Sequence, residues 1–345
     1  MSQAGFFDFE DRLEQLNACG NPLEQLSAAV DFELFRRTLT AARRKERQSN
    51  AGRKPYDVVL MFKILVLQSL YNLSDHQVEY QVRDRISFMA FLGLRPGDAV
   101  PDEKTVWLFR ETLVRQKLID KLFARFEREL EANGFAARKG HIADASIMPA
   151  PKQRNSRDDN DRIKRGERPP SFDENPCKSR QKDTDARWLK KHGQSHFGYK
   201  NHVLVDVEHK FIRAYAVTDA ATHDSQVIDR LLPTTPTGGR AVYGDSAYRS
   251  AAIGEMLEAR GYVDRIHRKA TRAHPLAARS VTANRSKSKV RARVEHVFGR
   301  QAQAIGGVLV RTIGLARAEI KGGLRNLVYN LDRFAMLMRR HASTA

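Results

Sequence analysis

The stretch from Arg240 to Ser250, RAVYGDSAYRS, constrains the fold more than any other part of the chain. A short apolar run stops at Asp245, and apolar residues from Ile253 onward then follow helical spacing. This pattern predicts a strand that turns at once into a helix, and open α/β sheets place their chemistry at such strand ends. Asp245 is therefore the first candidate for a functional residue.

Two further acids come from comparable positions. In GHIADAS an apolar strand-like run ends on Asp144, and RARVEHVFGR places Glu295 on a predicted helix, one turn after Arg291 on the same face. Each acid has an ordinary structural alternative: a strand-end cap for Asp144, a helix N-cap for Asp245, and an Arg291–Glu295 ion pair. Their joint occurrence in this order favours a shared site over three unrelated structural roles.

Two Asp from strands and one Glu from a later helix suit two-metal phosphoryl transfer. One divalent ion activates water or a 3′-hydroxyl, and the other stabilises the leaving oxygen. Mg²⁺ prefers hard oxygen ligands, and Mn²⁺ is an acceptable substitute. We expect two ions, with Asp144 as their shared ligand because it comes from the first strand, and with Asp245 and Glu295 each favouring one ion.

The charge balance indicates a polyanionic partner. The 345 residues contain 60 Lys+Arg against 41 Asp+Glu, a net charge of +19, for which nucleic acid is the default partner. Cys19 and Cys177 match neither a zinc spacing nor a disulfide framework. No run approaches the ~18 apolar residues of a membrane span, and the first residues lack the features of a signal peptide. We therefore expect a cytoplasmic protein without a membrane partner.

The most asymmetric charge lies just before Glu295. No acid occurs between Asp264 and Glu295, although ten basic residues do. Such a run is usually a solvated face, but its position before a catalytic helix favours a track for the DNA backbone. The predicted DNA-binding residues are Arg265, Arg268, Lys269, Arg272, Arg285, Lys287, Lys289, Arg291, Arg293 and Arg300.

Residues 1–135 are predicted to form a helical domain for DNA binding or dimerisation. Residues 56–73 are apolar almost all round, which indicates a buried helix, and Ser74 and Asp102 are start signals for the next helices. The domain could contain a helix-turn-helix unit that binds DNA or could be a scaffolding bundle, because no side-chain set identifies a recognition helix. The basic stretch 36–54 is either a solvated loop or an arm that contacts phosphates.

Residues 136–345 are predicted to form an α/β domain. Residues 150–190 are polar and rich in charge, so we expect a mobile loop there that orders on DNA. Phe197 to Asp206 and the run FIRAYAVTDA predict an antiparallel hairpin, and Tyr262 to Ile266 predict a fifth strand. The order of elements is that of the RNase H-like fold, a mixed five-stranded sheet flanked by helices.

Other polar residues near these elements are weaker candidates. Asp206 fits a turn, and Asp219 and Asp224 fit the edge of a site. His296 follows Glu295 and points about 100° away on a helix, so we expect packing or a phosphate contact rather than metal binding.

Several blocks, in order, resemble the transposases of bacterial insertion sequences of the IS-five branch, within the DDE superfamily. They include ADASI, FGYKNHVLVD, TDAATHDS, YGDSAY, RARVEHVFG and GGLRNLVYNLDRF. The resemblance implies that Asp144, Asp245 and Glu295 are the catalytic carboxylates. The family signature Y-x2-R-x3-E-x6-K is matched at Arg291 and Glu295, but Ser288 and Ala302 replace its tyrosine and lysine, and Lys287, Lys289 or Arg300 could supply the missing cation.

The resemblance also implies an activity and partners. Such a transposase hydrolyses the phosphodiester at each terminal inverted repeat of its element, and the freed 3′-hydroxyls attack target DNA. The implied assembly is a homo-oligomer, at least a dimer, that holds two DNA ends. A catalytically inactive DNA-binding regulator and an RNase H-like nuclease without strand transfer are the alternatives.

Overall fold

The computed structural model of the protein describes residues 8–42, 54–191, 193–234, 238–270, 275–303 and 309–344. The chain divides into two compact units. Unit 1 comprises Met1–Ala136, Arg300–Gly307 and Gly323–Ala345, and unit 2 comprises Ala137–Gly299 and Val308–Gly322. The first division falls one residue from the predicted domain boundary, but two C-terminal segments that we assigned to the α/β domain group with the helical unit.

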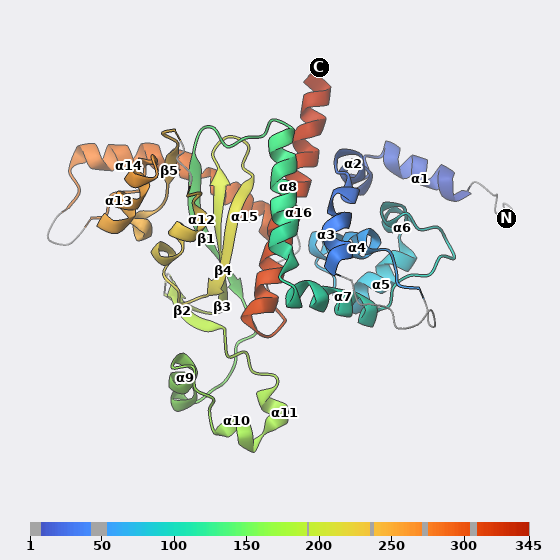
Figure 1. Cartoon of the computed structure of the whole chain (residues 1–345), viewed down its shortest axis with the longest axis horizontal. Helices are drawn as coiled ribbons and strands as arrows, with labels where there is room; N and C mark the ends of the chain where they lie inside the picture. Colours follow the sequence, from blue (N-terminus) through green and yellow to red (C-terminus); the bar gives the residue numbers. More distant parts are fainter. Residues whose placement is uncertain are drawn as a thin grey trace. The chain divides into compact units, whose positions relative to one another are not determined.

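The described part of the N-terminal segment is helical, as predicted (Figure 1). Its elements are α1 (Asp8–Ala18), α2 (Pro22–Ala29), η1 (Phe32–Phe35), α3 (Arg36–Ala42), α4 (Val58–Tyr71), α5 (Asp75–Asp84), α6 (Ile86–Leu92), α7 (Glu103–Arg115) and α8 (Leu118–Ala132). Much of the C-terminal helix α16 (Leu315–Thr344) also belongs to unit 1.

Local chemistry sets the helix boundaries of unit 1. Ser74 accepts from the backbone N–H of Gln77, whose side chain accepts from the N–H of Ser74, so the predicted capping box is confirmed. Asp102 accepts from the N–H of Thr105 and starts α7, as predicted. Lys117, with φ of 47°, separates α7 from α8.

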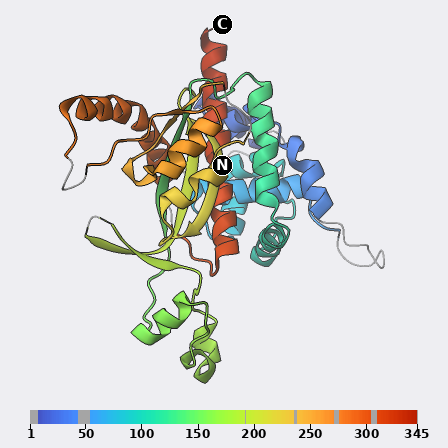
Figure 2. The same cartoon turned by 60° about the vertical axis from the view of Figure 1, so that its left-hand side comes forward.

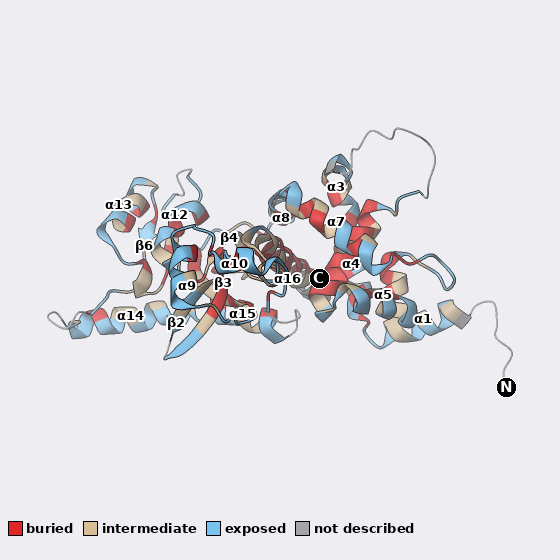
Figure 3. Ribbon diagram, turned by 90° about the horizontal axis from the view of Figure 1, so that it is seen from below, coloured by how far each residue is buried: buried red, intermediate tan, exposed pale blue. Residues whose placement is uncertain are grey.

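The core of unit 1 is aromatic. α4 is buried along almost its whole length, as its apolar sequence predicts, and Figure 3 shows it mostly in the colour of buried residues. The rings of Phe35 and Phe62 lie 4.9 Å apart, and those of Phe32 and Phe91 meet edge to face at 5.5 Å. Such ring pairs contribute about 0.5–1.5 kcal/mol beyond their area burial.

Unit 2 is built on a mixed sheet with the RNase H-like arrangement. Three antiparallel strands in the spatial order β4-β3-β1 are followed by β5 and β6, both parallel to β1. The strands are β1 (His141–Pro149), β2 (Arg187–Lys191), β3 (Gln194–Asp206), β4 (Ile212–Asp219), β5 (Ala241–Tyr243) and β6 (Val263–Asp264). The predicted fold class and the hairpin of β3 and β4 are thus confirmed.

Two apolar clusters cover the two faces of the sheet. On one face, Ala143 and Leu204 pack with residues of α12 (Ile228–Leu231) and α13 (Ala251–Ala259). On the other face, Met148 and Tyr199 pack with Val310 and the first turn of α16. The remaining elements of unit 2 are α9 (Arg157–Lys164), α10 (Ser171–Glu174), α11 (Pro176–Ser179), η2 (Asp224–Gln226), η3 (Ser246–Tyr248), α14 (Ala278–Arg291) and α15 (Arg293–Gln303).

Two predictions for unit 2 are corrected. The sheet of the described residues has six strands rather than five, because β2 pairs with the start of β3 on the same edge that β4 occupies further along. The segment 150–190 is not a structureless loop, since it forms α9, α10 and α11, and Figure 2 shows these helices below the β2–β3 hairpin. Ile163 and Phe172 are buried there, and Lys182 donates to the backbone oxygen of Arg154 at 2.8 Å. The mobility of this segment and its ordering on DNA remain predictions.

Both cysteines are free and exposed. Among the described residues, no single helix has the length and apolar content to cross a membrane, and the one pair that meets this criterion jointly, α4 with α5, bends by 101° between its helices.

Candidate active site

Asp144 lies in the middle of β1, the central strand of the sheet, and the prediction that this strand ends on Asp144 is wrong, because β1 continues to Pro149. β1 pairs with β3 along its whole length but with β5 only at His141 and Ile142. Asp144 is therefore just beyond the last residue that β5 covers. If the parallel register continued for two more residues, Asp144 would stand beside Asp245, which follows β5.

The carboxylate of Asp144 is largely buried and has few partners. Its side chain is 15% exposed, its Oδ1 accepts from the N–H of Ala145 at 2.8 Å, and its Oδ2 accepts from Nε of Arg291 at 3.3 Å. Burial raises the pKa of Asp144 to about 6 against the lowering effect of Arg291, and the nearby charges of Asp245 and Glu295 raise this pKa further. Asp245 and Glu295 are therefore both within electrostatic range of Asp144.

Asp245 is positioned by the turn after β5. Its Oδ1 accepts from the N–H of Ala247 at 2.8 Å and caps the short helix η3. The preceding Gly244 is buried, and a side chain there would meet the ring of Tyr248 at 3.2 Å. The capping role that we considered as an alternative is thus present, and it leaves Oδ2 of Asp245 without a hydrogen bond within the described part of the chain.

Glu295 lies in the first turn of α15 and is exposed. The prediction of one helix that carries both Arg291 and Glu295 is wrong, because α14 ends at Arg291 and α15 begins at Arg293. The break lets the Arg291 side chain reach Asp144, and the described residues show no ion pair between Arg291 and Glu295. The alternative in which Glu295 is simply the partner of Arg291 is therefore wrong as well.

The donor chemistry of these residues fits divalent cations. All three supply hard carboxylate oxygens, and the raised pKa of Asp144 shows that one nearby guanidinium only partly offsets the cost of its buried charge. The described residues nevertheless contain no group of three or more His, Cys, Asp or Glu side chains close enough to hold a metal ion. Coordination of shared cations by all three carboxylates would therefore require them to move closer together.

Comparison with known proteins identifies the family. The family model described as "Transposase DDE domain" matches residues 136–331, more than half of the chain, and the model described as "Transposase domain (DUF772)" matches residues 10–112. The chain belongs to the DDE transposase family. A cryo-EM structure of the piggyBac transposase synaptic complex with hairpin DNA is similar to this chain with 12% identity and a TM-score of 0.49, over 94% of this chain and 76% of that one.

Two residues beside the carboxylates of this transposase were not predicted. Tyr248 is fully buried, its hydroxyl has no hydrogen-bond partner among the described residues, and burial raises its pKa well above the ordinary value, with Asp224, Asp144 and Asp245 adding to the effect. His267 donates its backbone N–H to the oxygen of Gly244 at 3.1 Å, next to Asp245. YGDSAY contains Tyr248, but no sequence signal marks His267.

The electrostatic surroundings of His267 connect it to the same site. Burial lowers the pKa of His267, and the positive charges of Arg291 and Lys287 lower it further, whereas Asp245 raises it. Its Nε2 lies 3.3 Å from the hydroxyl oxygen of Ser288, which stands where the family signature has tyrosine. The transposase thus has a His267–Ser288 pair at that position.

The predicted DNA-binding residues fall into three groups. Arg265, Lys269, Arg285 and Lys289 are exposed, and Figure 3 shows α14 as largely exposed. Several others have partners within the protein: Arg268 donates to Ser280, Lys287 to the backbone oxygen of Ile266, Arg291 to Asp144, Arg293 to the backbone oxygen of Val207, and Arg300 to Asp332. Arg272 lies outside the described residues.

These partners decide which cation could replace the signature lysine. Arg300 forms a two-point ion pair with Asp332, at 3.0 Å for both contacts, and Lys287 is committed to a backbone oxygen at 2.8 Å. Lys289 is exposed on α14, and Ala302 is exposed on α15. Of the three cations that we considered, Lys289 is therefore the best placed to contact a phosphate.

The rival acids have structural partners. Asp206 is buried and accepts from the N–H of Phe211 at 2.9 Å, in the turn between β3 and β4, as predicted. Asp219 accepts from the hydroxyl of Thr222, and Asp224 accepts from Lys200 at 2.9 Å. His296 is exposed in α15. None of these contacts suggests a catalytic role.

Proposed function

We propose that this transposase cuts the phosphodiester bond at each end of its own DNA element and joins the freed 3′-hydroxyls to target DNA. The resemblance to the IS-five branch supports terminal inverted repeats as the substrate. The observation that supports the proposal is that Asp245, after the end of a strand, and Glu295, on a helix, both lie close enough to Asp144 on the central strand to raise its pKa.

In the proposed site, Asp144, Asp245 and Glu295 would hold two Mg²⁺ or Mn²⁺ ions, which would activate the attacking oxygen and stabilise the leaving oxygen. Asp144 is the natural shared ligand, because its strand β1 is paired with β3 on one side and β5 on the other. This makes β1 the most firmly held of the three elements that carry the acids. The side chain of Arg291 is 26% exposed beside Asp144 and could bind a phosphate oxygen of the substrate.

Three substitutions test the assignment. Asp144→Asn, Asp245→Asn and Glu295→Gln each remove a charged ligand but keep the side-chain size. We expect binding to DNA that carries the element ends to be retained, and metal-dependent strand cleavage to fall by at least about 10³-fold, because each change removes a charged metal ligand. Asp158→Asn, at an exposed acid of α9, is the matched control. Undiminished cleavage in any of the three variants removes that residue from the site.

Pre-cut DNA ends test the second half of the reaction. A transposase joins these ends to a target duplex in the presence of the metal ion, whereas a nuclease only hydrolyses DNA and a regulator does neither. Joined products that depend on Asp144 support the proposal. Nicking without joining, from an active preparation, would favour a nuclease.

The synaptic assembly and the cellular location also remain proposals. Two element ends must be held together for insertion at one target, so we propose at least a dimer in the DNA complex and an intracellular site of action, where the DNA is. Sedimentation of the protein with a duplex of one element end, compared with the protein alone, measures the stoichiometry.

A further inference from the structure

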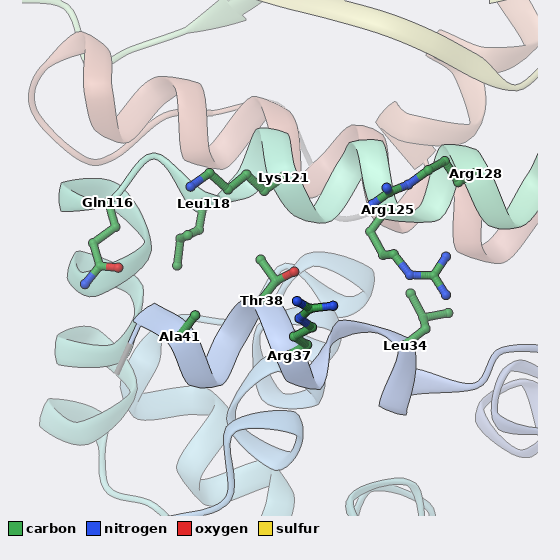
Figure 4. Close-up of a pocket in the computed structure, with 9 residues that line it drawn as sticks. All are labelled: Leu34, Arg37, Thr38, Ala41, Gln116, Leu118, Lys121, Arg125 and Arg128. Atoms are coloured by element: carbon green, nitrogen blue, oxygen red, sulfur yellow. The ribbon is translucent and has the colours of Figure 1, made fainter. Parts of the chain in front are cut away.

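Unit 1 contains a basic groove between α3 and α8 that the catalytic proposal does not use. The groove has a volume of about 700 Å³. Four cationic side chains line it, Arg37 from α3 and Lys121, Arg125 and Arg128 from α8, and none of the described residues that line it is acidic (Figure 4). Small-molecule pockets are usually lined mainly by apolar side chains, so this composition indicates an anionic occupant.

Helical spacing places the cations of α8 in a row. Lys121, Arg125 and Arg128 occupy positions i, i+4 and i+7 of the helix, which share one face. Another face, about 100° further round the helix, carries the buried residues Leu122 and Phe126, which anchor α8 in the core of unit 1. The row is therefore presented by a rigid helix rather than by a loop.

Most of these charges are available to a ligand. Arg125 forms an ion pair with Glu129 at 3.3 Å. Arg37, Lys121 and Arg128 are exposed, and in the described part of the chain they form no ion pair. Three of the four cations that line the groove thus form no ion pair with any of the residues that the structure describes.

The length of the row matches a nucleic-acid backbone. Seven residues of α-helix from Lys121 to Arg128 rise about 10 Å. One strand of duplex DNA carries one phosphate per ~3.4 Å of axis, so the row spans about three phosphates. A protein partner with an acidic segment would also satisfy the charge, but a regular row of cations suits a regular row of phosphates better.

We propose that the groove between α3 and α8 is a second DNA-binding site, which grips the phosphate backbone outside the catalytic centre. This assignment of the groove rests on the proposed function, in which DNA is the substrate. Arg37 on one wall and the three cations of α8 on the other flank the same groove (Figure 4), so a backbone in it would be contacted from both sides. Such contacts fix the position of DNA without specifying its sequence.

The test is the salt dependence of DNA binding by the full chain. The triple variant Arg37→Gln, Lys121→Gln, Arg128→Gln removes three free cations, and the control variant Arg12→Gln, Arg95→Gln, Lys104→Gln removes three exposed cations of unit 1 outside the groove. The probe is a labelled 40-base-pair duplex of arbitrary sequence, titrated from about 0.05 to 0.3 M KCl.

The groove variant should reduce the slope of log K against log salt by about 2.7, because each phosphate contact contributes about 0.9. At about 0.1 M salt this loss corresponds to a fall in affinity of about 100-fold or more. The control should change the slope by less than about one. Equal slopes for the groove variant and the control overturn the proposal.

Three further measurements complete the design. The thermal unfolding midpoint should change little, since the substituted residues are exposed. If the triple variant does not fold, Lys121→Gln alone should reduce the slope by about 0.9, against less than about 0.3 for the single control Lys104→Gln. Unchanged DNA binding with an altered oligomeric state would assign the groove to a protein partner and overturn the proposal. Asp144→Asn should retain the full slope, so a failure of the catalytic assignment is separable from a failure of this one.

Discussion

Replacing Asp144 by Asn should stabilise the folded protein at neutral and alkaline pH, although the same change should abolish cleavage. Burial raises the pKa of Asp144 to about 6, above its ordinary value of 3.8. Between these pH values the folded state binds more protons than the unfolded state, so stability falls as pH rises. The stabilising contribution of protonated Asp144 is complete below pH 3.8 and is lost above pH 6.

The magnitude follows from the difference between the two pKa values. From 3.8 to about 6, this difference corresponds to about 3 kcal/mol of unfolding free energy. Asn has a similar volume, keeps an oxygen for the N–H of Ala145, and carries no charge. The pKa of about 6 already includes the attraction of Arg291 for the charged carboxylate, so the loss of this partner needs no separate correction. The stabilisation should therefore be about 3 kcal/mol at pH 8 and close to zero at pH 4.

Urea unfolding at pH 8 and pH 4, in the presence of EDTA, measures the effect. Asp158→Asn is the control, because Asp158 is exposed and the change should stay within about 0.5 kcal/mol at both pH values. The reasoning is refuted if Asp144→Asn is no more stable than the wild type at pH 8. It is also refuted if the difference in unfolding free energy between the variant and the wild type is the same at pH 4 as at pH 8, because the buried charge would then not destabilise the fold.

Three more expectations concern the fold and the metal. Gly198→Ala should destabilise unit 2 by at least about 3 kcal/mol, because a Cβ would lie 2.3 Å from the backbone oxygen of Met148 at a φ of +148°; urea unfolding measures this. Burial lowers the pKa of His141 to about 4, so between pH 6.5 and 4 the unfolded state binds a proton that the folded state does not. The free energy of unfolding should therefore be highest above pH 6.5 and should fall by about 3 kcal/mol as the pH decreases from 6.5 to 4. Excess Mg²⁺ should raise the unfolding midpoint of the wild type and leave that of Asp144→Asn nearly unchanged.

Matched variants control these expectations. Gly254→Ala, in α13, where nothing lies within 4 Å of the added Cβ, should instead stabilise by about 0.5–1 kcal/mol. His141→Leu should show a shallower loss of stability between pH 6.5 and 4, and a parallel pH profile would contradict the assignment to His141. A Mg²⁺ response of equal size in Asp144→Asn would place the cation elsewhere.

Local signals in the sequence were sufficient for much of the helical unit. The capping box of Ser74 and the N-cap of Asp102 act within one turn of chain, so the residue types alone fix the helix starts. The long apolar run of α4 indicates burial without any knowledge of its neighbours. Both Asp could also be selected from the sequence by the apolar strand-like runs that carry them, although only Asp245 lies at the end of its strand, because β1 continues to Pro149.

Features that depend on distant partners were not predictable. β2 has the sequence RWLKK, whose cations argue against a strand, and it forms because β3 offers a free edge. Residues 150–190 contain few large apolar side chains, yet Ile163 and Phe172 are buried by chain that folds back over them. In neither segment does the local pattern show its tertiary partner.

The sequence predicted which acidic residues belong to the site, but not which other side chains surround them. Arg291 and Glu295 were expected on one face of one helix, with an ion pair between them as the alternative to a catalytic Glu295. In the structure the helix breaks at Ala292, and Arg291 pairs with Asp144. Tyr248 and His267 reach the same region because a buried turn and the chain after β6 bring them there. These approaches are properties of the folded chain.

The strands that carry the two aspartates differ in how firmly they are attached. β1 forms nine residue pairs with β3, whereas β5 forms two with β1 and two with β6. Backbone amides of β5 should therefore exchange with deuterated solvent sooner than those of β1, because fewer ladder bonds must open. The rearrangement that gathers the acidic groups around shared ions should accordingly be made by the short strand and the start of α15, with β1 as the fixed reference.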